Sequence, residues 1–128
     1  MSFNYTVKTQ KSVEQSIKDL TSSLSAIQFG VLGTLDFKSI FEKKGIEFEN
    51  EYKLLEICNP VAAKHVLDSN LDLGLLLPCT IAVYKKNNDT YISLAKPTSL
   101  LSIASDTKLS ELGKEIETKL IGIIDKIK

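Results

Sequence analysis

The sequence contains no arginine, and all sixteen of its basic residues are lysines. Sixteen acidic residues balance them, so the formal net charge at pH 7 is zero. Nucleic-acid binding depends on a basic surface, and recognition of phosphates or guanine edges favours the two-pronged arginine side chain. The composition therefore argues against a nucleic-acid partner, while lysine-only usage also fits AT-biased codons.

Targeting signals and long apolar segments are also missing. The first ten residues, MSFNYTVKTQ, lack the basic and apolar regions of a secretory signal. No run of about eighteen apolar residues is present to cross a bilayer. We therefore expect a cytoplasmic protein without membrane contact, in which the two cysteines are more often reduced than paired.

Two common signatures of chemistry are absent. Gly30 and Gly33 do not form a phosphate-binding GxGxxG loop, because the motif requires a third glycine and Asp36 stands where one would follow Gly33. The single histidine, His65, gives no specific basis for a Ser/His/Asp set. His65 also follows Lys64 on a predicted helix whose buried face is formed by other residues, so we expect a solvated side chain.

The length of 128 residues predicts one domain, spanning residues 1–128, with a core that needs no disulfide or metal. Hydrophobic residues make up 43% of the chain and charged residues 25%, a balance typical of globular proteins. No repeat, linker or low-complexity segment divides the chain.

Hydrophobic periodicity predicts alternating strands and helices. Strands are expected at residues 5–9, 29–35, 52–58, 79–86 and 91–95. Helices are expected at residues 13–27, 37–44, 60–69, 99–103 and 107–127, with Ser12, Asp36, Asn59 and Asp106 as N-caps. Ser12 and Gln15, three residues apart, match the capping-box pattern. Residues 71–77, LDLGLLL, fit either a strand or a buried loop. The order β-α-β-α-β-α-β-β-α predicts an α+β domain in which helices cover an antiparallel or mixed sheet of about four to five strands.

Both cysteines lie beside a proline. Cys58 ends the third predicted strand in the motif CNP, and Cys79 begins the fourth in the motif LPC. Asn59 and Pro60 together form a helix-start signal, since asparagine caps well and proline suits the first helical position. If the two strands are antiparallel neighbours, both sulfurs face the same end of the sheet.

The segments FGVLGTLD (residues 29–36), YKLLEICNP (52–60) and LGLLLPCTIAVY (73–84) resemble, in this order and spacing, the family called domain of unknown function 302. The resemblance spans nearly the whole chain. It implies a small α+β domain, commonly a homodimer, and brings no settled reaction. One position departs from the family pattern, because Lys96 precedes Pro97 where an acidic residue is usual.

Three functional interpretations of the cysteines stay open beside a purely structural one. The pair could be redox-active, with a thiolate favoured by the dipole of the helix that begins at Pro60. Cys58, Cys79 and His65 could bind haem or a metal, although the absence of CxxC spacing makes this a weak signature. The two motifs could instead line a ligand pocket beside a dimer interface. Cysteine also packs simply as a small hydrophobe.

The sequence favours a small homodimeric α+β module that binds a small-molecule ligand, with no assigned metal and no known cofactor. The most distinctive sequence features are the two cysteine motifs, whereas the apolar pattern of every predicted helix is explained by packing against the core. The alternative is a thiol redox or haem/metal protein using the same cysteines. The candidate ligand-binding residues are Cys58, Asn59, Pro60, Pro78 and Cys79.

Overall fold

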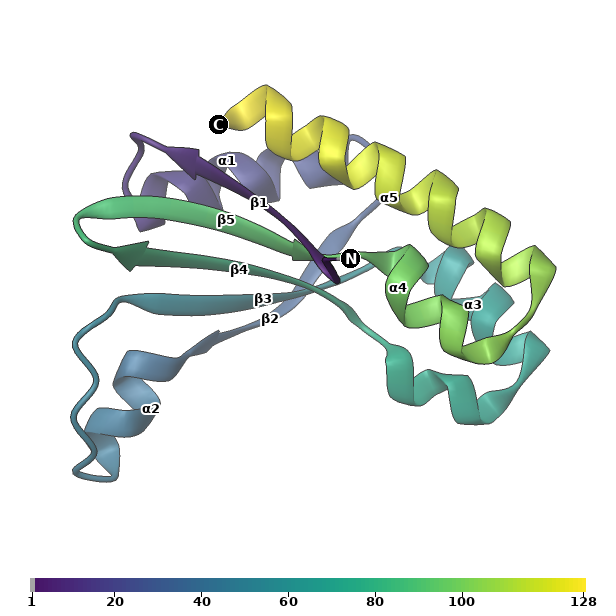
Figure 1. The fold of residues 1–128 in the computed structure, drawn as a ribbon, viewed down its shortest axis with the longest axis horizontal. Coiled ribbons are helices and arrows are strands. Elements are labelled where there is room, and N and C mark those ends of the chain that lie inside the picture. Colours follow the sequence, from purple (N-terminus) through teal and green to yellow (C-terminus); the bar gives the residue numbers. More distant parts are fainter. Residues whose placement is uncertain (1) are drawn as a thin grey trace.

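Five antiparallel strands form one sheet in the computed structural model, which describes residues 2–128 (Figure 1). Their order across the sheet is β1-β5-β4-β3-β2. The predicted α+β class is confirmed, and of the two expected sheet types the antiparallel one is present. The strands are β1 (Asn4–Thr9), β2 (Gly30–Asp36), β3 (Tyr52–Cys58), β4 (Cys79–Lys86) and β5 (Asp89–Ala95).

Helices cover one face of the sheet and one of its ends (Figure 1). Two long helices, α1 and α5, pack against each other above the sheet, while α3 and α4 lie beyond the strand ends. None of the described helices combines the length and the apolar character needed to cross a membrane. The helices are α1 (Val13–Ser25), α2 (Phe37–Lys43), α3 (Pro60–Ser69), α4 (Pro97–Leu101) and α5 (Thr107–Ile127), with 3₁₀ helices η1 (Leu71–Leu76) and η2 (Ser102–Ala104).

The four predicted N-caps are confirmed. Each side-chain oxygen accepts a hydrogen bond from a free backbone amide in the first turn, which stabilises a helix start by roughly 0.5–2 kcal/mol. Gln15 does not complete the expected capping box, because its amide donates to Asp19 Oδ1 at 2.8 Å instead. The capping residues are Ser12 for α1, Asp36 for α2, Asn59 for α3 and Asp106 for α5.

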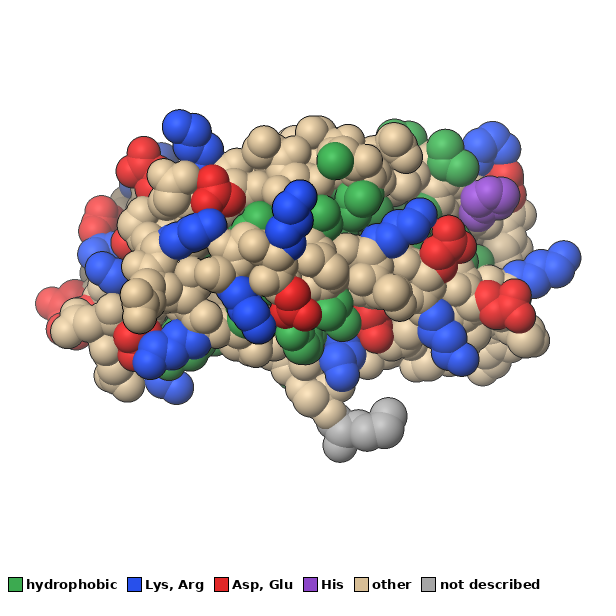
Figure 2. All heavy atoms as spheres, turned by 90° about the horizontal axis from the view of Figure 1, so that it is seen from above, with side chains coloured by type: hydrophobic (Ala, Val, Ile, Leu, Met, Phe, Trp, Pro, Cys, Tyr) green, Lys and Arg blue, Asp and Glu red, His purple; other side chains and the backbone are tan. Residues whose placement is uncertain are grey.

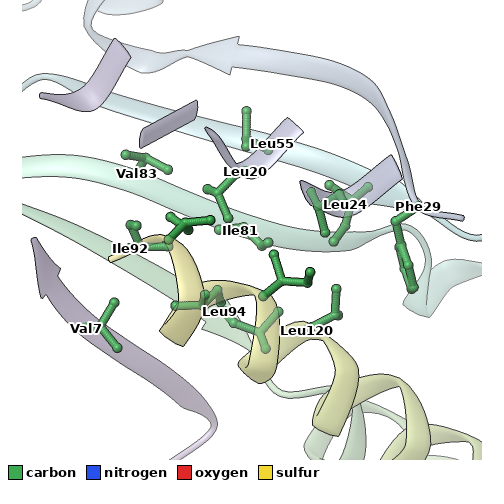
Figure 3. Close-up of a cluster of buried hydrophobic side chains, with 14 of the residues drawn as sticks. Val7, Leu20, Leu24, Phe29, Leu55, Ile81, Val83, Ile92, Leu94 and Leu120 are labelled. Atoms are coloured by element: carbon green, nitrogen blue, oxygen red, sulfur yellow. The ribbon is translucent and has the colours of Figure 1, made fainter. Parts of the chain in front are cut away.

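The core lies between the sheet and the two long helices (Figure 3). Leu55, Ile81 and Ile92 project from three neighbouring strands and are fully buried. Leu20 of α1 and Leu120 of α5 face them and are equally buried. Each such side chain contributes roughly 1.5–3 kcal/mol by leaving water, so this layer fixes the sheet against the helices. Further fully buried members are Leu24, Ile57, Val83, Leu94 and Ile124.

Among the helices of residues 2–128, only α2 lies on the opposite face of the sheet, at its edge (Figure 1). Because side chains alternate along a strand, this face receives the residues that follow or precede the core positions. Tyr84 stacks on Tyr52 with ring centroids 5.3 Å apart and on Tyr91 at 5.6 Å. We call this surface the open face; its central side chains are Leu35, Tyr52, Leu54, Tyr84, Tyr91 and Ser93.

Three predicted boundaries were wrong. The helix expected to reach residue 27 ends at Ser25, because Gln28 adopts a left-handed conformation with φ of 60° and turns the chain into β2. Residues 71–76 form a 3₁₀ helix, neither a strand nor a loop. The short helix expected at 99–103 begins at Pro97 and gives way to a 3₁₀ turn.

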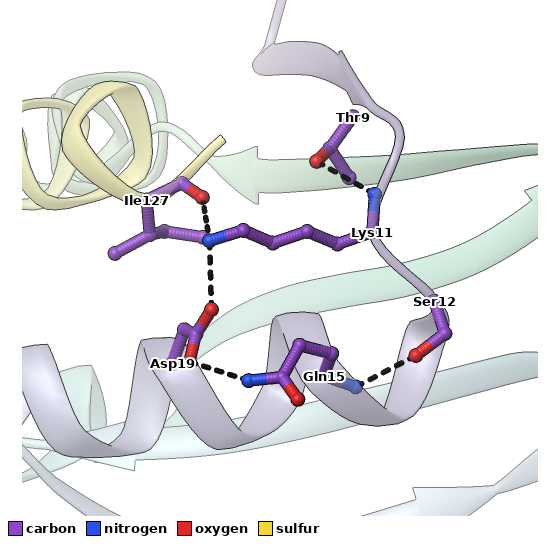
Figure 4. A network of polar contacts seen from close by, with 6 residues as sticks. All are labelled: Thr9, Lys11, Ser12, Gln15, Asp19 and Ile127. Carbon is purple, nitrogen blue, oxygen red and sulfur yellow. Dashed lines mark hydrogen bonds and ion pairs between the residues drawn. The ribbon is translucent and has the colours of Figure 1, made fainter.

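A lysine ties the start of α1 to the end of α5 (Figure 4). Lys11 Nζ donates to Asp19 Oδ2 at 2.7 Å and to the backbone carbonyl of Ile127. The ammonium therefore meets a free carbonyl at the negative end of α5, where a cation is stabilising. Hydrogen bonds from Lys11 and Gln15 lower the pKa of Asp19.

Charges of both signs are interspersed over the helix-covered side of the molecule. Figure 2, which views the protein from above, shows lysines and acidic side chains side by side rather than a continuous basic area.

Candidate functional site

The fold brings the two cysteine motifs to the same end of the sheet. β3 and β4 are antiparallel neighbours, and Ile57 of β3 lies opposite Cys79 of β4. Cys58 is the next residue along β3, so both cysteines lie at the end where α3 begins. Pro78 immediately precedes β4, and Asn59 immediately precedes α3. The spatial expectation from the sequence is therefore confirmed.

A small apolar cavity of about 30 Å³ lies between the two motifs. Cys58, Asn59, Pro78 and Cys79 all contribute to its wall, so four of the five candidate residues surround one space. Pro60 does not line the cavity: it occupies the first position of α3 and is exposed. Its role is to begin the helix, for which its missing amide hydrogen is suited.

The rest of the wall comes from side chains that the sequence pattern assigned only to packing. They belong to α3, to the segment that leads into β4, and to α4 and α5, which lie far away in the sequence. The signal for Phe29 was present, since it begins the FGVL motif, but nothing in the sequence places α4 or α5 beside it. The main additional wall residues are Phe29, Ala63, Val66, Leu77, Leu101 and Ile116.

Both thiols are protonated near neutral pH. Burial and the neighbouring Cys58 sulfur raise the pKa of Cys79 from its ordinary value of 9.0 to about 11. Burial also raises the pKa of Cys58. The redox interpretation relies on the dipole of α3 to favour a thiolate, and the raised pKa values of both thiols oppose that interpretation. Neither cysteine forms a disulfide.

The third residue of the haem or metal interpretation lies elsewhere. His65 is exposed, as expected, and faces a separate groove between α3 and α5 rather than the cavity of the cysteines. Within residues 2–128, no group of three or more His, Cys, Asp and Glu side chains is close enough to hold a metal ion. Cys58, Cys79 and His65 therefore do not form a three-ligand set.

The wall formed by α4 depends on contacts with α5. Lys96, the residue before Pro97, makes no side-chain cap for α4. Glu117 of α5 replaces it, because its Oε1 accepts hydrogen bonds from the Thr98 amide at 3.2 Å and the Thr98 hydroxyl at 2.6 Å. A carboxylate at a helix start is favourable for the dipole. Gly113 of α5 lets α4 approach so closely that an added Cβ would lie 3.3 Å from Leu101 Cδ1.

Comparison with known proteins supports the resemblance seen in the sequence. The family model "Domain of unknown function DUF302" matches residues 5–127. A crystal structure of an uncharacterized conserved DUF302 protein from Bacillus stearothermophilus is 35% identical, with each chain covered over 100% of its length and a TM-score of 0.95. No protein of the curated set matches the chain significantly. With its whole length matched in sequence and in fold, the chain belongs to the DUF302 family, a domain of unknown function.

Proposed function

We propose that the protein is a homodimeric binding module whose ligand occupies the apolar cavity between the CNP and LPC motifs. The observation that supports this most directly is convergence: residues of both motifs, from two strands and a helix start, surround one space. Small-molecule sites are typically concave and mostly apolar with a few polar groups. Here Asn59 supplies a polar group, and leucine, proline and phenylalanine side chains supply the apolar wall.

The chemistry of the wall favours binding over catalysis. The two thiols are held in their neutral form, and a protonated thiol is a poor nucleophile and a poor metal ligand. The volume of about 30 Å³ has room for about two or three water-sized groups. The cavity is therefore suited to a very small apolar molecule or to the apolar end of a larger one.

A specific observation keeps a redox function as the second candidate. Cys58 and Cys79 lie on neighbouring strands, one residue out of register, so their Cα atoms fall within the limit of about 7 Å for a disulfide. Regular alternation, however, directs the Cys58 side chain to the face opposite that of Cys79. Bond formation would then require the end of β3 to twist, and the raised pKa values oppose thiolate attack.

The open face supports the proposed dimer. Five strands about 4.8 Å apart and seven residues about 3.3 Å apart define an area of roughly 550 Å². A standard interface buries about 800 Å² per partner, so the open face together with the adjoining α2 is large enough. Its tyrosine stack and Leu54 are typical of interface centres, and a two-fold axis would place the same surface on both subunits.

Methyl NMR spectra under xenon pressure test the cavity, since xenon enters apolar cavities without needing a polar partner. We expect xenon to shift the methyl signals of Val66, Leu101 and Ile116. Ala63→Leu, which fills the cavity, should abolish these shifts, and Ala26→Leu on the exposed end of α1 should preserve them. Shifts confined to other methyl groups would contradict the proposed site.

Native mass spectrometry tests the assembly. A mass of twice the 14.2 kDa chain at micromolar concentration is expected. A single-chain mass under the same conditions would contradict the homodimer. The cytoplasmic location and the absence of a nucleic-acid partner stay predictions from the sequence.

A further inference from the structure

A second hollow lies directly outside the cavity, between α3 and α5. It has a volume of about 340 Å³, and we call it the outer groove. It shares part of its wall with the inner cavity, so that only a layer of side chains separates the two spaces. The shared residues are Phe29, Asn59, Ala62 and Ile116.

The two spaces differ in polarity. The inner cavity is almost entirely apolar, whereas the wall of the outer groove combines apolar side chains with the polar side chains of Gln28, Asn59, His65, Glu115 and Lys119. A molecule that extends through the shared wall would therefore place an apolar end inside and a polar head group outside. Phe29 and Ile116 belong to this shared wall, so a ligand that spans both spaces must displace one of these side chains.

The charges of the outer groove favour an uncharged head group. Lys119 and Glu115 form an ion pair at 3.4 Å and cancel each other. An ion of either sign entering the groove would meet one like charge and one opposite charge, so the pair gives neither sign a net attraction. A neutral group meets no such opposition and leaves the pair intact.

Asn59 lines both spaces and carries a hydrogen-bond donor at their boundary. Its Oδ1 accepts from the amides of Val61 and Ala62 at 3.0 and 3.2 Å, as the cap of α3. With the oxygen engaged, Nδ2 is left without a hydrogen-bond partner in residues 2–128. A carbonyl oxygen of a ligand fits this donor, and the amide of Gln28 lines the same groove.

From this juxtaposition we infer that the natural ligand is a small uncharged amphiphile: a carboxamide or similar neutral carbonyl head group attached to an apolar end of about two or three carbon atoms. The head group lies in the outer groove against Asn59, and the apolar end lies beside Cys79. This inference rests on the proposed function, since it assigns a ligand class to the same cavity.

Three probes with similar tails and different head groups test the class: butyramide, butyrate and butylammonium. In NMR titrations at pH 7 we expect butyramide to bind most tightly and its terminal methyl to show nuclear Overhauser contacts to Val66 or Leu101. Equal or tighter binding of butyrate or butylammonium would overturn the inference. So would the absence of butyramide binding in protein that still responds to xenon, an outcome that leaves the proposed cavity intact. Loss of the xenon response as well would overturn both.

The variant Asn59→Asp tests the donor without removing the helix cap, because aspartate caps as well as asparagine. It replaces the Nδ2 donor with an oxygen, so butyramide affinity should fall by about three- to tenfold. Asn70→Asp is the matched control, since Asn70 caps η1 through the same kind of contact to Asp72 and does not line either space. Unchanged butyramide affinity in Asn59→Asp would contradict the role of the donor.

Discussion

The closest approach of α4 to α5 makes a sharp prediction about two glycines of one helix. Gly113 and Gly122 both lie within α5, and alanine in a helix interior is more favourable than glycine by about 1 kcal/mol. Gly122 is exposed, and nothing lies within 4 Å of an added Cβ. Gly122→Ala should therefore raise the free energy of unfolding by nearly this amount.

Gly113→Ala should not show the same gain. Its Cβ would lie 3.3 Å from Leu101 Cδ1 and 3.5 Å from both the Pro97 carbonyl oxygen and Thr98 Cα. The two backbone distances are ordinary van der Waals contacts, so the strain falls on Leu101, whose side chain must shift by a few tenths of an ångström within a packed cluster. Overpacking of this kind costs about 1–3 kcal/mol, which offsets the helical gain. We expect a net change from about zero to a loss of about 2 kcal/mol.

Urea unfolding followed by circular dichroism measures both variants against the wild type. We expect the unfolding free energy to depend on urea with the same slope in all three proteins, and the urea concentration at the midpoint to change in the expected directions. This result would confirm that α4 packs closely on Gly113. An equal increase in stability for the two variants would refute the close packing of α4 on α5. Because α4 contributes Leu101 to the cavity wall, the same result would also argue against one wall of the proposed site.

Three further predictions concern the open face, a buried hydroxyl and the cysteines. Leu54→Lys places a charge at the centre of the open face and should give a monomer in light scattering. The control Ile103→Lys, at an exposed position of η2, should leave the dimer intact. A dimer of the Leu54→Lys variant would contradict the proposed interface. The Ser16 hydroxyl is fully buried in α1 without a hydrogen-bond partner in residues 2–128, so Ser16→Ala should raise the stability to urea by about 0.5–1 kcal/mol, and a clear loss would show that the hydroxyl has a partner. Because the folded state holds Cys79 protonated up to a pKa of about 11, against 9.0 ordinarily, its contribution to stability is complete below pH 9 and is lost as the pH rises through 11. The stability advantage of the wild type over Cys79→Ala should therefore shrink by at most roughly 2.7 kcal/mol over this range, and a pH-independent difference would argue against a raised pKa.

Local chemistry made much of the fold predictable from the sequence. Ser12 and Asn59 cap their helices through hydrogen bonds to residues two or three positions away, so a short sequence pattern is enough to predict these helix starts. The hairpin between β4 and β5 turns at Asn87 and Asn88, both with positive φ, which asparagine tolerates better than most residues.

The features that the sequence did not predict depend on distant residues or on competing effects. The start of α4 at Pro97 lacks a local cap and is stabilised by Glu117, twenty residues later in the chain. Seven residues of LDLGLLL do not distinguish a strand from a 3₁₀ turn by periodicity.

The candidate site likewise combines a feature that the sequence suggested with one that depends on distant residues. That Cys58 and Cys79 lie at the same end of the sheet depends on β3 and β4 being antiparallel neighbours, which the sequence offered only as a condition and the structure shows. That their pKa values rise depends on how much surrounding wall excludes water, and this wall includes Ile116 from the last helix. Burial of this kind is a property of the assembled fold, so the sequence pattern alone does not reveal it.

A crystal structure determined under xenon pressure tests the cavity between the CNP and LPC motifs most directly. A xenon peak in contact with Cys79 and Leu101 is expected in the wild type and should be absent from Ala63→Leu. A wild-type crystal with xenon only at other positions would contradict a ligand cavity at these motifs.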